Sequence, residues 1–149
     1  MKEITGDIWD YHKKGHWIVI TTNGTVRSNG EVVMGRGFAL QAKQRYPELP
    51  KVLGSMILEL GNCLFHWGER GLVFFSVKYN WWEKASLELI EKSAKELRDF
   101  FDNVVADYPT PVYLLRVGCG NGRLNWRDVK PTLEKYLDDR FVVVERKTR

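Results

Sequence analysis

Glycines cluster in two segments of this 149-residue sequence, and each segment has the composition of a phosphate-binding loop. Seven of the 13 glycines fall within residues 24–37 and 118–122. Glycine lets backbone N–H groups approach an anion closely, and a helix that follows adds partial positive charge. The two loops together therefore suggest a pyrophosphate ligand, although tight turns that need positive φ would explain either loop alone.

Neither segment matches a common nucleotide-binding motif. The first ends Val33-Met34-Gly35-Arg36-Gly37-Phe38-Ala39, and the second reads Gly118-Cys119-Gly120-Asn121-Gly122-Arg123-Leu124. No Gly-Lys-Ser/Thr follows either loop, and neither fits GxGxxG with an acidic residue about 20 positions later. The candidate ligand-binding residues in the two loops are Met34, Gly35, Arg36, Gly37, Gly118, Cys119, Gly120, Asn121, Gly122 and Arg123.

Short apolar runs and helical periodicity predict the elements that must position these loops. β-Branched and aromatic residues predict strands at residues 2–5, 17–21, 63–67, 72–77, 112–116 and 141–145. Gly68-Glu69-Arg70-Gly71 predicts a hairpin between two of them, and therefore one antiparallel pair. Apolar residues at spacings of three and four predict a long helix over residues 87–101. Shorter helices are expected over residues 36–46 and 128–137, with Pro131 in the first turn of the latter.

This alternation predicts an α/β fold with a mixed, mostly parallel six-stranded sheet covered by helices on both faces. In such a sheet, ligands bind at the carboxyl ends of the strands. Each glycine loop follows a predicted strand and precedes a predicted helix. We therefore expect both loops to face one crevice.

Length and composition indicate one soluble globular domain spanning residues 1–149, with 44% hydrophobic and 28% charged residues. The longest apolar stretches are four residues, too short to cross a membrane. The first residues lack the apolar core of a secretory signal, so we expect a cytoplasmic protein. The net charge of +4 permits an anionic ligand without identifying one.

Cysteine and histidine spacing indicates neither a disulfide framework nor a metal site. The two cysteines are Cys63 and Cys119, and they do not form a CxxC motif. His12, His16 and His66 show no HxxxH or carboxylate spacing. We expect no metal and no cofactor.

The order of the motifs resembles that of a macrodomain over nearly the whole chain. Gly6-Asp7-Ile8 follows the first strand, Asn23 follows the second, and the loop at residues 33–39 opens a helix. A later strand leads into Arg-Val-Gly-Cys-Gly-Asn-Gly-Arg-Leu-Asn-Trp. The resemblance implies a three-layer α/β/α fold that binds ADP-ribose, and many members of the family remove ADP-ribose from proteins, nucleic acids or small molecules.

The resemblance also assigns roles to residues outside the two loops. Asp7 would accept a hydrogen bond from the adenine amino group, with Ile8 supplying backbone contact, whereas an isolated Asp here would otherwise be an N-cap. Asn23 would lie near the distal ribose, or would be an ordinary turn residue of Asn-Gly. Residues 25–32 lengthen this loop, so Asn29 could serve instead of Asn23.

Lys78, at the end of the strand Phe75-Ser76-Val77, resembles the catalytic lysine of two branches of the family. These are the terminal ADP-ribose glycohydrolase and the antitoxins that remove ADP-ribose from DNA, and the Gly-Cys-Gly-Asn-Gly loop with Trp126 favours the antitoxin-like branch. Its amine could attack the distal ribose when neutral, or stabilise charge as an ammonium. A lysine that extends into solvent is the alternative without the resemblance.

At an ordinary pKa only about one lysine in a thousand is neutral at pH 7.4, so nucleophilic attack needs burial or nearby positive charge. Tyr79, Trp81 and Trp82 could supply an apolar wall. One residue departs from the glycohydrolase pattern, because Gly122 stands where that branch has an aspartate. Cys119 is interpreted as a small residue that permits close phosphate approach, since no histidine is positioned as its base.

The leading function is removal of ADP-ribose from a modified nucleobase or protein side chain, with Lys78 and Asn23 as catalytic candidates. The alternatives are a non-catalytic ADP-ribose reader and a hydrolase of a small ADP-ribose derivative. A nucleic-acid-binding module that uses exposed tryptophans is a third class, but it lacks a recognition motif. Expected partners are ADP-ribose or an ADP-ribosylated substrate, including nucleic acid, and no membrane; we expect a monomer.

Overall fold

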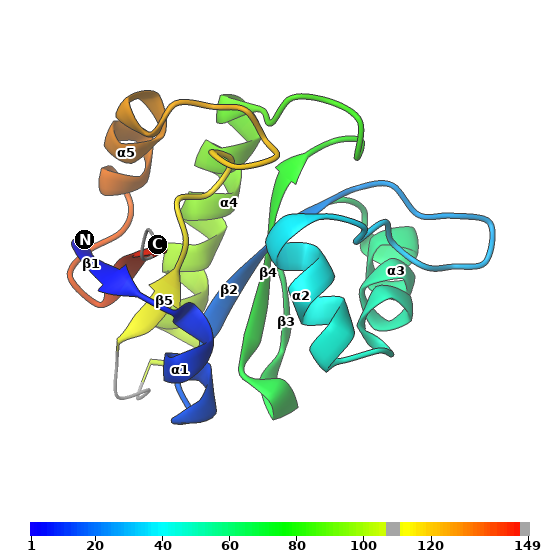
Figure 1. Ribbon diagram of the computed structural model, residues 1–149, viewed down its shortest axis with the longest axis horizontal. Coiled ribbons are helices and arrows are strands. Elements are labelled where there is room, and N and C mark those ends of the chain that lie inside the picture. Colours follow the sequence, from blue (N-terminus) through cyan, green and yellow to red (C-terminus); the bar gives the residue numbers. More distant parts are fainter. Residues whose placement is uncertain (107–110, 147–149) are drawn as a thin grey trace.

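A central sheet organises the computed structural model, which describes residues 1–106 and 111–146. Its strands are β1 (Lys2–Gly6), β2 (Ile18–Asn23), β3 (Phe65–Trp67), β4 (Leu72–Lys78), β5 (Val112–Leu114) and β6 (Phe141–Arg146), in the order β1-β6-β5-β2-β4-β3. Neighbouring strands are parallel except β3, which pairs antiparallel with β4. The mixed, mostly parallel six-stranded sheet is confirmed (Figure 1).

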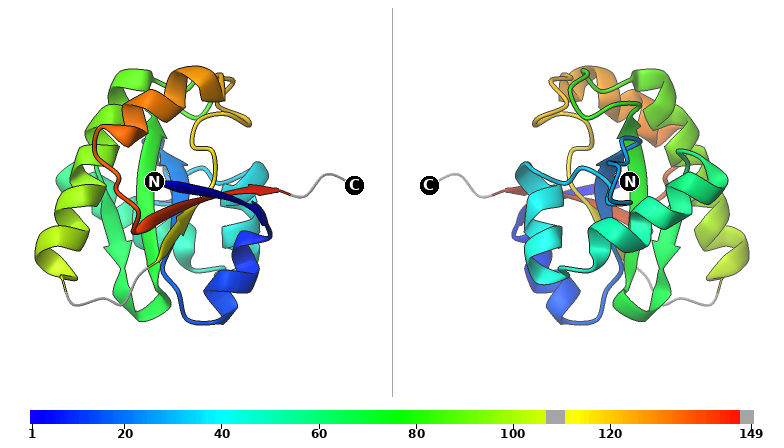
Figure 2. Two further views of the ribbon diagram at one scale, coloured as in Figure 1. Left: turned by 90° about the vertical axis from the view of Figure 1, so that its left-hand side faces the viewer. Right: turned by 90° about the vertical axis from the view of Figure 1, so that its right-hand side faces the viewer.

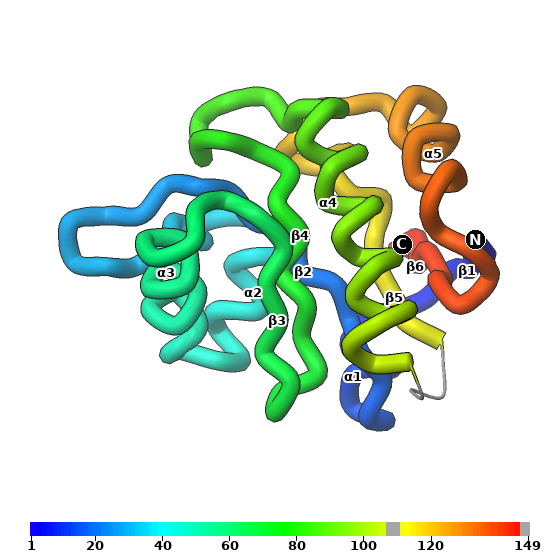
Figure 3. The backbone as a smooth tube through the Cα atoms, turned by 180° about the vertical axis from the view of Figure 1, so that it is seen from behind, coloured from blue at the N-terminus to red at the C-terminus, as the bar shows by residue number. Residues whose placement is uncertain are grey.

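Helices cover both faces of this sheet. They are α1 (Ile8–Lys13), α2 (Gly37–Arg45), α3 (Leu49–Leu60), α4 (Leu87–Asp99) and α5 (Trp126–Glu134). A 3-10 turn, η1 (Gly68–Arg70), joins β3 to β4, and a π-helical segment, η2 (Phe100–Val104), extends α4. Figure 2 shows α4 and α5 on one side of the sheet and α1 and α2 on the other, and Figure 3 shows α4 lying across the near face.

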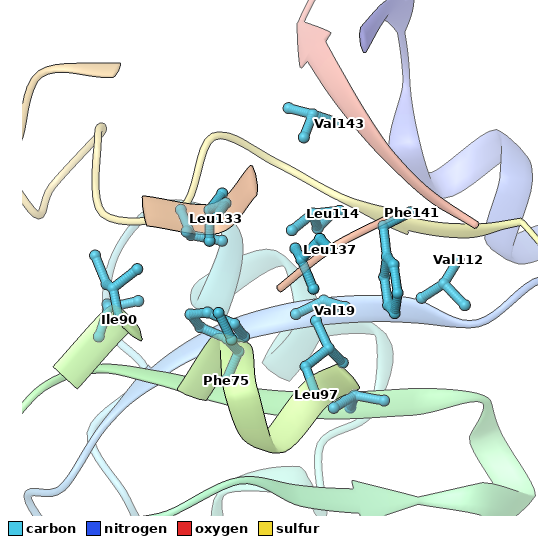
Figure 4. Packing of buried hydrophobic residues seen from close by; sticks show 14 of the residues in the cluster. Val19, Phe75, Ile90, Leu97, Val112, Leu114, Leu133, Leu137, Phe141 and Val143 are labelled. Atoms are coloured by element: carbon cyan, nitrogen blue, oxygen red, sulfur yellow. The ribbon is translucent and has the colours of Figure 1, made fainter. Parts of the chain in front are cut away.

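Strand side chains alternate between two hydrophobic cores. In β2, Val19 belongs to the core under α4 and α5, whereas Ile18 and Ile20 belong to the core under α1, α2 and α3. Phe75 of β4 and Val143 of β6 face the first core in the same way (Figure 4). A sheet buried on both faces needs such nearly continuous apolar strands. The rigid sheet fixes the positions of the loops at its ends.

Two details of the helices differ from expectation. The predicted helix at residues 128–137 instead begins at Trp126, after the N-cap Asn125, so Pro131 lies inside α5 and not in its first turn. Neither α1 nor α3 was among the predicted helices, and α3 is the longer of the two. Pro50 lies at its start and Gly54 in its middle, and a side chain at Gly54 would collide with the carbonyl oxygen of Gly30. Position 54 therefore requires glycine because α3 packs closely against the backbone of Gly30, and not because the chain turns there.

Within residues 1–106 and 111–146, no helix is long and apolar enough to span a membrane. The same residues contain no group of three or more His, Cys, Asp or Glu side chains that could hold a metal ion.

Candidate functional site

A cleft of about 640 Å³ lies at the carboxyl ends of β2, β4 and β5, as the sequence predicted for the two glycine loops. This size suits a nucleotide-like ligand, because typical ligand pockets measure roughly 300–1,000 Å³. The carboxyl ends of these strands point toward the upper part of Figure 1, and the segments that follow them contribute residues to the cleft. Nine of the ten candidate loop residues line the cleft: Met34, Gly35, Arg36, Gly37, Gly118, Gly120, Asn121, Gly122 and Arg123.

The two glycine loops meet directly inside the cleft. Gly37, the first residue of α2, lies so close to Asn121 that a Cβ on Gly37 would stand 2.6 Å from Asn121 Nδ2. Arg36, the N-cap of α2, makes no side-chain capping bond to the helix. The N-terminus of α2 and the second loop therefore border the same space, and the unpaired N–H groups at the start of a helix favour phosphate oxygens there.

Two glycines of the loops have open space where a side chain would project. A Cβ built on Gly35 or on Gly120 meets no atom within 4 Å, and both residues line the cleft. Gly118 and Gly122 differ from these two residues, because close packing leaves no room for a Cβ at either position. A Cβ on Gly118 would lie 2.7 Å from Ile90, and one on Gly122 would collide with the carbonyl oxygen of Gly118.

The same collision decides the Gly122 question raised by the sequence. In this loop conformation no aspartate fits at position 122, because any Cβ there meets backbone. Among the described residues that line the cleft, Glu83 carries the one carboxylate, and its Oε1 accepts a hydrogen bond of 2.8 Å from Asn80. A Lys/Asp pair with the aspartate at position 122 is therefore unavailable to this protein.

Lys78 is half-buried at the end of β4 and points into the cleft. Its Nζ donates to the carbonyl oxygens of Trp81 (3.3 Å) and Asn121 (3.2 Å), so the amine connects the strand end to the second glycine loop. Burial lowers the pKa of Lys78 below the ordinary value, and the positive charges of Arg123 and Arg36 lower this pKa further. At a given pH, a larger fraction of the Lys78 amine is therefore neutral than for a lysine in water.

Asn62, on the segment after α3, fixes the backbone from which Lys78 projects. Its Nδ2 donates to the Lys78 carbonyl oxygen at 3.1 Å, and its Oδ1 accepts from the Ser76 hydroxyl at 2.7 Å. The register between β2 and β4 shifts at this point, so that Asn23 pairs with Lys78. Nothing in the local sequence around Asn62 announces this role, since its partners are 14 and 16 residues away.

Asn23 lines the cleft, but its amide is already engaged in shaping the first loop. Nδ2 donates to the Val33 carbonyl oxygen and Oδ1 accepts from the Thr25 N–H, each at 2.9 Å. Asn23 therefore joins the two ends of residues 25–33. Asn29, the alternative candidate, is exposed, bonds to Glu31 and is not among the cleft residues.

Asp7, Ile8 and Cys119 are not among the residues that line the cleft. Asp7 caps α1, and its Oδ1 accepts from the Trp9 N–H at 3.0 Å. Ile8 is 4% exposed within the core. Cys119 is half-buried against the other core, and burial raises the pKa of its thiol, which argues against a nucleophilic thiolate.

Sequence reasoning missed two arginines of the cleft, Arg27 and Arg116. Arg116 follows β5 at the same edge as the glycine loops, so its position in the chain could have identified it. Arg27 lies within the lengthened loop at residues 25–32, where no local pattern indicates that it reaches the cleft. Trp81 and Trp82 line the cleft as expected, whereas Tyr79 does not.

Comparisons with known proteins agree with this architecture. No family model matches the chain. The DNA ADP-ribosyl glycohydrolases of Mycobacterium tuberculosis and Mycobacterium bovis are each 30% identical to it over 68% of the chain. The chain spans about 30% of the length of these curated relatives.

Solved structures resemble the chain over almost its full length. The macrodomain of Thermus aquaticus DarG has a TM-score of 0.74 at 23% identity, and that of Mycobacterium tuberculosis DarG has 0.75 at 24%; each pairing covers 98% of this chain and 97% of the other. Thermosipho africanus DarTG in complex with ADP-ribose has a TM-score of 0.70 at 17% identity, covering 99% of this chain and 42% of that one. These likenesses show that the chain has the macrodomain fold.

Proposed function

We propose that this protein is an ADP-ribosyl glycohydrolase that removes ADP-ribose from modified DNA and depends on Lys78. The observation that carries the proposal is the position of the Lys78 amine, half-buried in a cleft between two glycine loops with its pKa lowered. The names of the mycobacterial relatives support DNA as the carrier of ADP-ribose.

The glycine loops would hold the pyrophosphate. Gly35 and Gly120 leave room for phosphate oxygens close to the backbone, and the N-terminus of α2 adds partial positive charge. Arg36 and Arg123 would supply full charges beside the same oxygens. Asp7, with one carboxylate oxygen bound to the Trp9 N–H, retains another that could accept from the adenine amino group.

Two roles fit the Lys78 amine. As a nucleophile, the neutral amine would form a bond to the anomeric carbon of the distal ribose while the bond to the carrier breaks and the carrier takes up the proton. Opening of the ribose ring would give a Schiff base, which water would hydrolyse to ADP-ribose and free lysine. As an ammonium, Lys78 would stabilise developing negative charge while water attacks. The lowered pKa of Lys78 favours the first role.

A non-catalytic reader is the second candidate, and the packing at Gly122 favours it. Position 122 cannot hold an aspartate, and the one carboxylate among the described residues of the cleft, that of Glu83, accepts a hydrogen bond from Asn80. A reader would use the same loops and arginines to bind ADP-ribose but would not turn over its substrate. A hydrolase of a small ADP-ribose derivative would use the same chemistry on a smaller carrier.

Turnover assays with two substrates separate these functions. The proposal predicts release of ADP-ribose from ADP-ribosylated single-stranded DNA, with slower or no release from glutamate-linked ADP-ribosyl protein. Binding of ADP-ribose without release from either substrate would favour the reader.

The proposal includes a cytoplasmic location, where the DNA substrate would be, and a monomeric state, because residues of one chain line the described cleft.

A further inference from the structure

Two neighbouring tryptophans form an exposed aromatic surface beside Lys78. Trp81 is 43% exposed and Trp82 is 60% exposed, although both line the cleft. Their rings meet edge to face, with centroids 6.0 Å apart and an interplanar angle of 88°. Large aromatic side chains usually bury most of their surface, so exposed indoles at the mouth of a cleft indicate an interaction surface.

Hydrogen bonds hold the backbone that carries these indoles. The Trp81 N–H donates to Thr25 Oγ1 at 3.0 Å, and the Trp81 carbonyl oxygen accepts from Lys78 Nζ. On either side, the Gly24 N–H donates to the Tyr79 carbonyl oxygen at 3.2 Å and the Asn80 side chain is bonded to Glu83. The backbone beneath the aromatic surface is therefore held in place, which lowers the entropy cost of ordering this segment when a ligand stacks on the indoles.

The charge around this surface is positive. Arg27, Arg36 and Arg123 line the same cleft as the two indoles. The carboxylate of Glu83, which would repel an anion, is bonded to the amide of Asn80. Flat exposed rings bordered by cations match the chemistry of single-stranded nucleic acid, in which bases stack on aromatic side chains while phosphates contact basic ones. Bases in a duplex already stack on each other and cannot use the indoles in this way.

We infer that Trp81 and Trp82 form a stacking platform for unpaired bases next to the ADP-ribosylated base of single-stranded DNA. This inference rests on the proposed function, since Lys78 marks where the ADP-ribose is attached to the carrier. Lys78 Nζ donates to the Trp81 carbonyl oxygen, so a carrier attached to a distal ribose at Lys78 would lie beside Trp81. The platform makes the protein prefer an ADP-ribosylated oligonucleotide to an ADP-ribosylated mononucleotide, which has no neighbouring bases to stack.

The test compares these two substrates in variants of the platform. Trp82→Ala and Trp81→Ala should each lower kcat/KM for the oligonucleotide about fivefold to hundredfold more than for the mononucleotide, which corresponds to loss of one base–aromatic stack. Trp82→Phe should restore much of the loss, because a phenyl ring still stacks. Tyr79→Ala is the matched control: Tyr79 is 52% exposed on the same segment but does not line the cleft, so its removal should affect both substrates equally.

Binding measurements keep this inference separate from the proposed function. In a Lys78→Ala background, Trp82→Ala should weaken binding of the intact ADP-ribosylated oligonucleotide more than binding of free ADP-ribose. If the protein shows this difference in binding but no turnover, the stacking platform is supported and the proposed hydrolase activity is rejected. Equal losses for oligonucleotide and mononucleotide would assign the indoles to the ADP-ribose pocket and overturn the platform. An unchanged preference for the oligonucleotide in both tryptophan variants would also overturn the platform. So would a loss of kcat/KM on an ADP-ribosylated peptide equal to the loss on the oligonucleotide.

Discussion

The two glycine loops approach the same cleft but use glycine for different reasons. In the second loop, Gly118 has φ of +75° and packs against Ile90, and Gly122 packs against the backbone of Gly118. Gly120, between them, has open space on its side-chain side. In the first loop, Gly35 is open in the same way, and Gly37 is needed both for its φ of +56° and for the close approach of Asn121.

This difference teaches that a glycine cluster combines two separate requirements. Gly118, Gly122 and Gly37 are required to form the loops and hold them together, so their replacement should damage folding. Gly35 and Gly120 are not required by the described fold, so their replacement should damage only what enters the cleft. The comparison yields opposite expectations for neighbouring residues.

The largest effect is expected at Gly118. Gly118→Val places a β-branched residue at positive φ and forces a side chain into Ile90, which should lower the free energy of unfolding by about 2–5 kcal/mol. Urea or thermal unfolding measures this loss. Gly122→Ala should also destabilise, because its Cβ meets the Gly118 carbonyl. A Gly118→Val variant as stable as the parent would show that the loop can readily adopt another conformation.

The opposite result is expected at Gly35 and Gly120. Gly35→Val and Gly120→Val should leave the unfolding transition nearly unchanged but weaken ADP-ribose binding by at least about a hundredfold, because the new side chain occupies space for phosphate oxygens. Titration calorimetry and a melting curve on the same samples separate the two effects. If both variants bind ADP-ribose normally, these glycines are ordinary loop residues and the phosphate site lies elsewhere.

A smaller effect is expected at Asp7, which lies outside both loops. Asp7→Ala should weaken ADP-ribose binding by about 1–3 kcal/mol through loss of a charged hydrogen bond. It should also destabilise α1 by about 1 kcal/mol, because the cap on the Trp9 N–H is lost. Asp7→Asn is the matched control, since an asparagine still caps the helix while the charge is removed. Equal ADP-ribose affinity in all three proteins would leave Asp7 with a capping role alone.

The smallest effect is expected on the pKa of Lys78, which the charge of Arg123 in the second loop lowers. Arg123→Gln removes a positive charge that lowers the pKa of Lys78, so this pKa should rise. If the neutral amine is the nucleophile, kcat increases as pH rises through the Lys78 pKa, and the variant shifts that increase to higher pH. If the ammonium is required, kcat falls as pH rises through the same pKa, and the variant shifts the fall to higher pH. The pH profile of kcat therefore identifies the active form of the amine, and a profile that does not move would exclude coupling between Arg123 and Lys78.

Much of this architecture follows from local patterns. All six strands were predicted from short segments with β-branched or aromatic residues, which are apolar runs in every strand except β1, and the cleft was predicted from two glycine loops at parallel strand ends. The helix α3 was missed because Pro50 and Gly54 resemble helix-breaking residues, whereas Gly54 serves contact with Gly30. Local sequence cannot show such contacts between distant segments.

The candidate site shows the same limit. Lys78 and the loop residues were identified from motifs, but the support of Lys78 by Asn62 and the reach of Arg27 into the cleft depend on tertiary packing. Asn23 was named for a ligand role, yet both ends of its amide bond to the first loop. Spacing along the chain identifies residues that can do chemistry, whereas their remaining hydrogen-bonding capacity appears only in the fold.

The most direct test of the central claim is single-turnover release of ADP-ribose from ADP-ribosylated single-stranded DNA by the parent protein and by Lys78→Ala. We expect Lys78→Ala to reduce turnover by at least about a hundredfold while ADP-ribose affinity stays within roughly tenfold, because the phosphates and adenine carry most of the binding. Borohydride added during turnover should leave a reduced ribose covalently attached to Lys78 if the amine is the nucleophile. A Lys78→Ala variant as active as the parent would contradict the account and remove the lysine from the mechanism.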